Sequence, residues 1–219
     1  MTQLNYREIQ KALRIEKYKN IANYDKVVDL GINAMWEDLC EKVHGQNIDP
    51  TELFDVELEN LKDLEYSMKL MNICYLSELW EQDLYSFLKE EGLIEVSSNE
   101  YRATKRILEQ NFPTCAISNF PKIVEMRTLV NAIKHGEGNA FTAIRQATNE
   151  TILADSNIGI ADESGTVTKK KQVEIDGNNA LTGRTLNVDG KLQEYSSAVV
   201  DFWKCVYSAQ PSPTESPEQ

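Results

Sequence analysis

A stretch of about forty residues without a helix breaker constrains the fold of this chain more than any other feature. Asp49-Pro50-Thr51 has the pattern of a helix start, and neither glycine nor proline follows it until Gly92. Apolar side chains recur along the stretch at spacings of three, four or seven residues, namely Phe54, Leu58, Leu61, Met68, Met71, Tyr75 and Leu79. The pattern predicts one long central helix, roughly 60 Å long at 1.5 Å per residue.

Further helices are predicted on both sides of this element. The second half of the long stretch, MKLMNICYLSELW, is apolar nearly all round and should have neighbours on several sides. Val27, Leu30, Ala34 and Leu39 space an apolar face on a preceding helix. After it, the predicted helices cover about residues 97–110, 121–135, 140–147 and 191–206.

Residues 150–190 have a different character, because they are polar and glycine-rich. TVTKKKQVEI and LTGRTLNV flank an Asp176-Gly177 turn, which predicts a β-hairpin. The expected fold is therefore mainly α, a helical bundle with a long central helix and a small β-hairpin insertion. The expected segments are an N-terminal helical part (1–48), a helical core (49–149), the insertion (150–190), a C-terminal helix on the core (191–208) and a disordered tail (209–219).

Composition excludes several classes of protein. No apolar run approaches the roughly 18 residues that a membrane-spanning helix needs, and the first residues lack a signal sequence. The four cysteines, Cys40, Cys74, Cys115 and Cys205, form no CxxC pair and indicate reduced thiols in the cytoplasm. With two histidines in the whole chain, neither a metal site nor a cofactor is expected.

Charge is distributed unevenly along the chain. The net charge is −12, which disfavours a protein that coats nucleic acid. Residues 98–147, however, carry seven basic and four acidic side chains, whereas residues 1–97 carry ten and twenty. This central segment could steer an anionic substrate to a local site, or its small excess could be chance variation.

The predicted helix that starts at Pro121 carries a polar stripe. Arg127, Asn131 and His135 lie at i, i+4 and i+8, so each is about one turn above the last. A guanidinium can hold a phosphate, an amide can orient it, and a histidine can move a proton near neutral pH. Such a set could cleave RNA without a metal. The same spacing also occurs on helix faces that only meet water or a neighbouring helix.

The residues around the stripe resemble a known family. The blocks Trp80-Glu81-Gln82-Asp83-Leu84, Glu125-Met126-Arg127 with Asn131-Ala132 and Lys134-His135-Gly136, and Tyr195 with Phe202-Trp203 are similar to bacterial HEPN-like helical proteins. The resemblance covers roughly residues 50–150 and the last helix. It implies a helical bundle of a defence or toxin–antitoxin system that acts as a dimer. Active HEPN proteins are metal-independent endoribonucleases whose motif joins an arginine and a histidine.

Carried over to this chain, the resemblance assigns specific roles. His135 would be the catalytic histidine, Arg127 the phosphate-binding arginine and Asn131 its polar partner, while Lys134, Arg102 and Arg106 would bind RNA. Seven residues separate Arg127 from His135, more than in the usual motif. Many HEPN domains are not nucleases, which leaves an alternative function. The chain would then be a non-catalytic module that binds a partner protein encoded nearby, as an antitoxin, regulatory or scaffold subunit.

Overall fold

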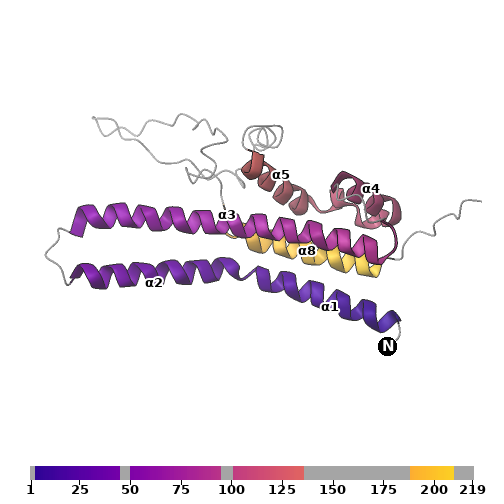
Figure 1. The fold of residues 1–219 in the computed structure, drawn as a ribbon, viewed down its shortest axis with the longest axis horizontal. Helices are drawn as coiled ribbons and strands as arrows, with labels where there is room; N and C mark the ends of the chain where they lie inside the picture. The colour runs from indigo at the N-terminus through magenta and orange to yellow at the C-terminus, as the bar shows by residue number, and fades with distance from the viewer. Residues whose placement is uncertain (1–2, 45–49, 95–100, 136–187, 210–219) are drawn as a thin grey trace, which may run out of the picture. The chain divides into compact units, whose positions relative to one another are not determined.

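The computed structural model of the chain describes residues 3–44, 50–94, 101–135 and 188–209. Within these ranges all regular elements are helices (Figure 1). In chain order they are α1 (Gln3–Ile21), α2 (Tyr24–His44), α3 (Pro50–Glu90), α4 (Tyr101–Asn111), the 3₁₀ turns η1 (Pro113–Cys115) and η2 (Ile117–Asn119), α5 (Pro121–His135) and α8 (Lys191–Ser208). The predicted mainly α class is confirmed.

The long central helix is continuous and ends where the sequence indicates. Helix α3 spans 41 residues, and Gly92 follows it with a φ of 72°, a left-handed conformation that glycine adopts without strain. The amide of Gly92 donates to the Lys89 carbonyl at 3.0 Å and that of Leu93 to the Leu88 carbonyl at 2.9 Å. These bonds satisfy carbonyl groups at the helix end.

The structure divides the chain into two compact units. Unit 1 comprises residues 1–24, 72–127 and 192–219, and unit 2 comprises residues 25–71 and 128–191. Helices α3 and α5 each contribute to both units. The five segments predicted from the sequence stay a prediction about the chain's organisation.

Unit 1 is built around a cluster of aromatic side chains. Trp80 of α3 lies edge-on to Phe202 of α8, with ring centroids 5.6 Å apart, and Phe87 of α3 lies 5.7 Å from Trp203. Phe112, at the end of α4, packs on Phe87 at 5.6 Å. All five rings are almost completely buried. The apolar second half of α3 therefore has neighbours on several sides, as predicted.

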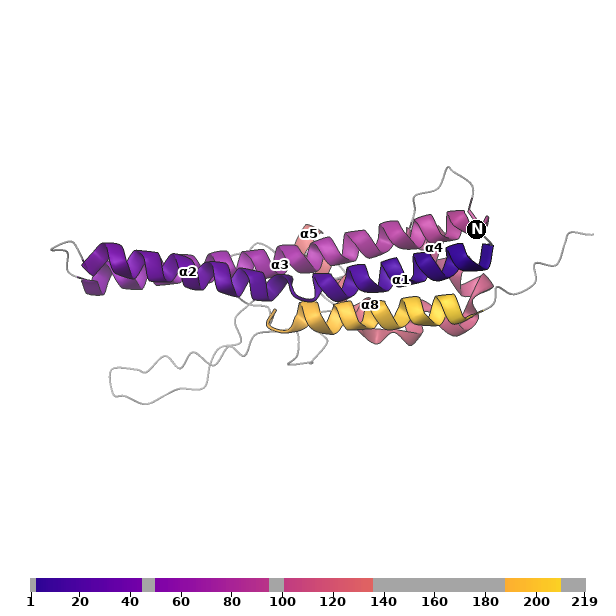
Figure 2. The same cartoon turned by 90° about the horizontal axis from the view of Figure 1, so that it is seen from below.

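Unit 2 contains α2 and the first half of α3, which run antiparallel and side by side (Figures 1 and 2). Val28 of α2 and Leu61 of α3 are buried. Lys69 of α3 reaches Asp29 of α2 with 3.0 Å between Nζ and Oδ1. This ion pair links the start of α2 to the end of the α3 segment that belongs to unit 2.

The predicted fold class was wrong in one part, the β-hairpin insertion. The described residues contain no β-strand, and residues 188–190 form the turn that leads into α8. The prediction depended on local turn preferences alone, whereas a two-stranded hairpin needs a further strand or helix face for stability. Residues 150–187, the helix predicted at 140–147 and the tail from residue 210 lie outside the described residues.

Among the described residues, none of the helices combines the length and the apolar character that a bilayer crossing requires.

Candidate functional site

Packing of α5 positions the predicted catalytic stripe. Pro121 occupies the first turn of the helix, and the buried side chains Ile123, Met126 and Val130 hold one side of it against the protein. Arg127 projects from the flank of this apolar side and is half-buried. The environment of its guanidinium decides what this residue can do.

Arg127 is fully engaged inside unit 1. Its Nε donates to Oε1 of Glu81 on α3 at 2.7 Å, and its guanidinium carbon lies 3.0 Å from the ring centroid of Tyr101 on α4. The side chains of Arg127 and Glu81 are 18% and 32% exposed, so water screens the pair only in part. A phosphate could use this guanidinium only after displacing a carboxylate, which makes Arg127 a link between three helices.

The phenol of Tyr101 adds no acid–base group to the stripe. Burial raises the pKa of Tyr101 to about 12, although the neighbouring charge of Arg127 acts in the opposite direction. The phenol therefore keeps its proton at neutral pH and cannot act as a general base.

The other predicted site residues lie on α4 and α5. Asn131 is half-buried and Lys134 exposed on α5, while Arg102 and Arg106 are exposed on α4. His135 is the last residue of α5, and its side chain lies outside the described residues. The three predicted catalytic residues thus share one helix, and Arg127 is the member whose contacts are structural.

Arg14 is a buried charged residue elsewhere in unit 1, and its guanidinium has polar partners. Arg14 of α1 donates to both carboxylate oxygens of Glu90, at 3.1 and 3.2 Å, and to the hydroxyl of Tyr207. Burial alone would lower the pKa of Arg14, but Tyr207 and Glu90 outweigh this effect and raise it. Sequence periodicity could not identify this residue, because a charged position on a weakly apolar helix gives no sign of burial.

Two further carboxylates of unit 1, Asp83 and Glu125, have structural partners. Asp83 accepts a hydrogen bond from Tyr18 at 2.7 Å and lies 2.5 Å from Lys17 Nζ. Glu125 accepts from the hydroxyl of Tyr195 at 2.9 Å. Among the described residues, no group of three or more histidine, cysteine or acidic side chains could hold a metal ion.

A disulfide corrects the sequence interpretation of the cysteines as reduced thiols. Cys115 of η1 and Cys205 of α8 are bonded, with Cα atoms 5.9 Å apart. Cys40 and Cys74 form no disulfide. Ninety positions separate the bonded pair along the chain, so spacing could not reveal it. The bond ties the connection between α4 and α5 to the last helix.

A cluster of charged side chains in unit 2 surrounds Lys69. Lys69 is buried, and its Nζ lies 3.0 Å from Asp29, 2.5 Å from Glu65 and 3.1 Å from Asp189. Burial would lower the pKa of Lys69, but the three carboxylates raise it further than burial lowers it. The ammonium therefore stays charged and holds α2, α3 and the turn before α8 together.

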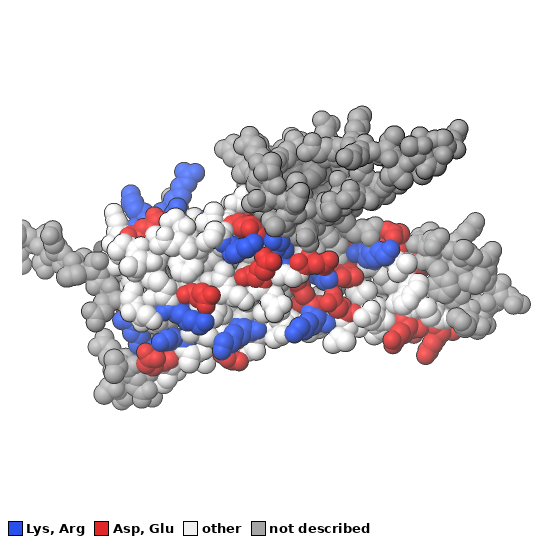
Figure 3. Space-filling model, turned by 180° about the vertical axis from the view of Figure 1, so that it is seen from behind, with Lys and Arg blue, Asp and Glu red and all other residues white. Residues whose placement is uncertain are grey.

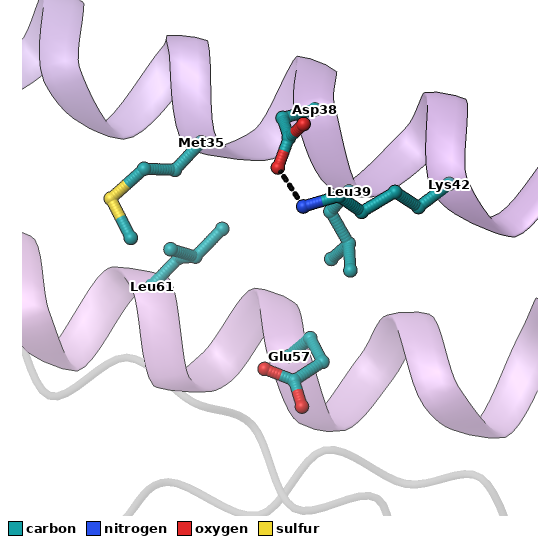
Figure 4. Close-up of a pocket in the computed structure, with 6 residues that line it drawn as sticks. All are labelled: Met35, Asp38, Leu39, Lys42, Glu57 and Leu61. Atoms are coloured by element: carbon teal, nitrogen blue, oxygen red, sulfur yellow. Dashed lines mark hydrogen bonds and ion pairs between the residues drawn. The ribbon is translucent and has the colours of Figure 1, made fainter.

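An apolar groove lies between α2 and α3. An open pocket of about 180 Å³ is lined by six side chains, Met35, Asp38, Leu39, Lys42, Glu57 and Leu61. Figure 4 shows Met35 of α2 and Leu61 of α3 pointing toward each other across it. Lys42 is paired with Asp38 at 2.5 Å. The pocket is thus apolar at its centre and carries a carboxylate from each helix.

The apolar row predicted on α2 is exposed rather than buried. Val27 and Leu30 keep 66% and 70% of their surface accessible, and Met71 of α3 keeps 70%. Helix α2 carries two apolar rows, because Val28 and Ile32 face α3 while Val27 and Ala34 lie on another side. Two rows on one helix could have indicated a second binding surface from the sequence.

The chain was compared with protein-family models, curated proteins and solved structures, and none of them matches it. The resemblance to HEPN-like proteins therefore stays a prediction.

Proposed function

We propose that this chain is a non-catalytic helical module that binds another protein, and that its binding surface is the groove between α2 and α3. The observation that carries the proposal is the apolar row beside the pocket. Leu64, Met68 and Met71 follow at i, i+4 and i+7 on α3 and are all exposed. This spacing forms one face of a helix, and no described residue covers it.

Removal of exposed apolar side chains from water would favour binding at this surface. Burying a Val, Leu or Met side chain completely is worth roughly 1.5 to 3 kcal/mol. Five side chains beside the groove, from 40% to 70% exposed, therefore leave several kcal/mol of apolar burial unused in the isolated chain: Val27, Met35, Leu64, Met68 and Met71. Contiguous apolar surface of this kind marks protein interaction sites.

The charged surface supports protein binding over RNA binding. On the face shown in Figure 3, Lys and Arg side chains stand among Asp and Glu side chains, without a broad basic area among the coloured residues. Arg127, the phosphate-binding arginine of the nuclease interpretation, is held by Glu81. Lys122, a second cation on α5, is held by Glu125 and Glu194.

The second candidate is the HEPN-like endoribonuclease of a defence or toxin–antitoxin system, acting as a homodimer in the cytoplasm. Its support is that Arg127, Asn131 and His135 share α5, within the net basic segment of the sequence. For this function Arg127 would have to leave Glu81 and Tyr101 when RNA binds.

Co-expression tests the two candidates against each other. The chain is produced with each protein encoded by the neighbouring genes, and co-purification and RNA integrity are measured. Wild type and His135→Ala should each co-purify with a partner and leave RNA intact. Met68→Gln/Met71→Gln should no longer co-purify with that partner.

Leu13→Gln is the matched control, because Leu13 is 60% exposed on α1, in unit 1. This variant should retain the partner. RNA cleavage by the wild type that His135→Ala abolishes would contradict the proposal and support the nuclease.

A further inference from the structure

We infer that the groove between α2 and α3 takes a basic amphipathic helix of a partner protein. The inference rests on the proposed function and adds the chemistry of the partner. It depends on three observations in unit 2: two rows of residues that start at one pocket and carry exposed apolar side chains, open space at Gly31 on the α2 row, and a net negative charge around the rows.

Both rows run from the pocket in the same direction. On α2, Gly31 and Val27 follow Met35 at intervals of four residues toward the start of the helix. On α3, Leu64, Met68 and Met71 follow Leu61 at helical spacing. Because Met35 and Leu61 line the same pocket and the helices are antiparallel, the two rows continue along the same side of the pair.

The row on α2 is open at its centre, where a partner helix can approach the backbone. Gly31 is exposed, and a Cβ atom added there would meet nothing within 4 Å. The ten-residue step from Leu61 to Met71 covers roughly 15 Å, about three helical turns. Methionines contribute at Met35, Met68 and Met71, and this flexible side chain adapts to the side chains of a partner. Helices bind such grooves through residues at i, i+3, i+4 and i+7.

The net charge around the groove indicates which kind of partner helix it would bind. Residues 25–44 carry five acidic and two basic side chains, and residues 57–71 carry four and two. Cations of the two helices are paired within the unit: Lys42 with Asp38, Lys62 with Glu59, and Lys69 with Glu65 and Asp29. Asp38, Lys42 and Glu57 line the pocket itself, so its net charge is negative although Lys42 is paired with Asp38. A partner with Lys or Arg beside its apolar row therefore gains attraction at both rims.

The same charge argues against a second copy of this chain as the occupant. Two identical grooves would bring the acidic rims of both copies together, and like charges at an interface oppose association. The basic helix has the complementary sign and the same apolar spacing.

The test uses the full chain and two synthetic helical peptides of about 18 residues, long enough for partial helicity in water. One has leucine at helical spacing with Lys and Arg elsewhere, and the other has Glu at those charged positions. Binding is measured by fluorescence anisotropy. The basic peptide should bind and the acidic one should not. Raising NaCl from about 0.05 M to about 0.5 M should weaken binding about tenfold.

Variants separate groove binding from adsorption to an acidic surface. Met68→Gln/Met71→Gln should lower the affinity for the basic peptide about tenfold or more, because both changes remove apolar burial without changing charge. Leu13→Gln should bind like wild type. Equal binding by all three proteins would overturn the inference, as would equal binding of both peptides. Circular dichroism checks that each variant is folded.

The oligomeric state distinguishes the inference from the proposed function. Sedimentation should show wild type and Met68→Gln/Met71→Gln with the same mass. If wild type alone is a dimer, the second copy occupies the groove, which overturns the inference and leaves the groove as a binding surface. A neighbouring-gene partner that binds both proteins equally would instead overturn the proposed function.

Discussion

Arg127 gives the most informative single perturbation, because the two candidate functions assign it opposite roles. In the structure it donates a 2.7 Å hydrogen bond to Glu81 and lies over the ring of Tyr101. We expect Arg127→Met, which keeps an apolar stem and removes the charge, to destabilise the fold. Glu81→Gln is the matched change on the other side of the pair.

The magnitude follows from the contacts. A hydrogen bond between charged groups contributes roughly 1.5 to 3 kcal/mol, and a cation over an aromatic ring about 0.5 to 2 kcal/mol. Because both side chains keep some exposure to water, the lower part of the summed range applies, about 2 to 3 kcal/mol. For a chain of this size the corresponding fall in Tm is roughly 4 to 12 °C.

Denaturant unfolding of wild type, both single variants and the double variant measures the interaction directly. The double-mutant cycle should give a coupling free energy of about 1 to 2 kcal/mol between Arg127 and Glu81. Binding of the partner should be unchanged in every folded variant. A stability within about 0.5 kcal/mol of wild type for Arg127→Met would refute the structural role of this arginine.

Three further changes test other parts of the structure. Replacing the disulfide by Cys115→Ser/Cys205→Ser should lower the free energy of unfolding by about 4 to 5 kcal/mol, because the bond closes a loop of ninety positions; wild type in dithiothreitol should approach the variant, and equal thermal stability with and without reductant would exclude the bond. The pKa of Tyr101 is raised to about 12 in the folded protein, above the ordinary value near 10. The protonated phenol therefore contributes fully to folding stability below pH 10, and this contribution is lost as pH rises toward 12. Between pH 10 and 12 the free energy of unfolding of Tyr101→Phe should therefore fall less steeply than that of wild type, by about 1.4 kcal/mol per pH unit. Equal slopes of the free energy of unfolding against pH would contradict this. Lys69→Met should cost about 2 to 3 kcal/mol because it leaves Asp29, Glu65 and Asp189 together without a cation; an unchanged urea midpoint would show that the cluster is not stabilising.

The helices with strong local signals were predictable from the sequence. Pro50 and Gly92 bound α3, and Pro121 starts α5, because proline and glycine act on the backbone at their own position. The start of α8 at Lys191 agrees with the prediction, and its apolar side contains the buried Leu192, Tyr195 and Val199.

Features that depend on contacts distant in sequence were not predictable. Burial of Arg14 and Lys69 requires partners 76 and 120 positions away, Glu90 and Asp189. The sequence predicted an apolar face through Val27 on α2, yet Val27 is exposed and the neighbouring Val28 is buried. The expected hairpin followed turn preferences that say nothing about packing.

For the candidate site, the sequence located α5 but not the environment of its arginine. Periodicity places Arg127, Asn131 and His135 on one helix, whereas the partners of Arg127 come from α3 and α4. The groove could not be predicted, because its apolar side chains have the same helical spacing in the sequence as buried core residues. Only the structure shows that the row of Leu64, Met68 and Met71 remains exposed.

Hydrogen–deuterium exchange of the chain with and without its bound partner tests the central claim most directly. We predict slower exchange in the complex over residues 27–39 of α2 and 61–71 of α3, with no change over residues 121–135 of α5. Slower exchange confined to α5, with the groove helices unaffected, would contradict the account.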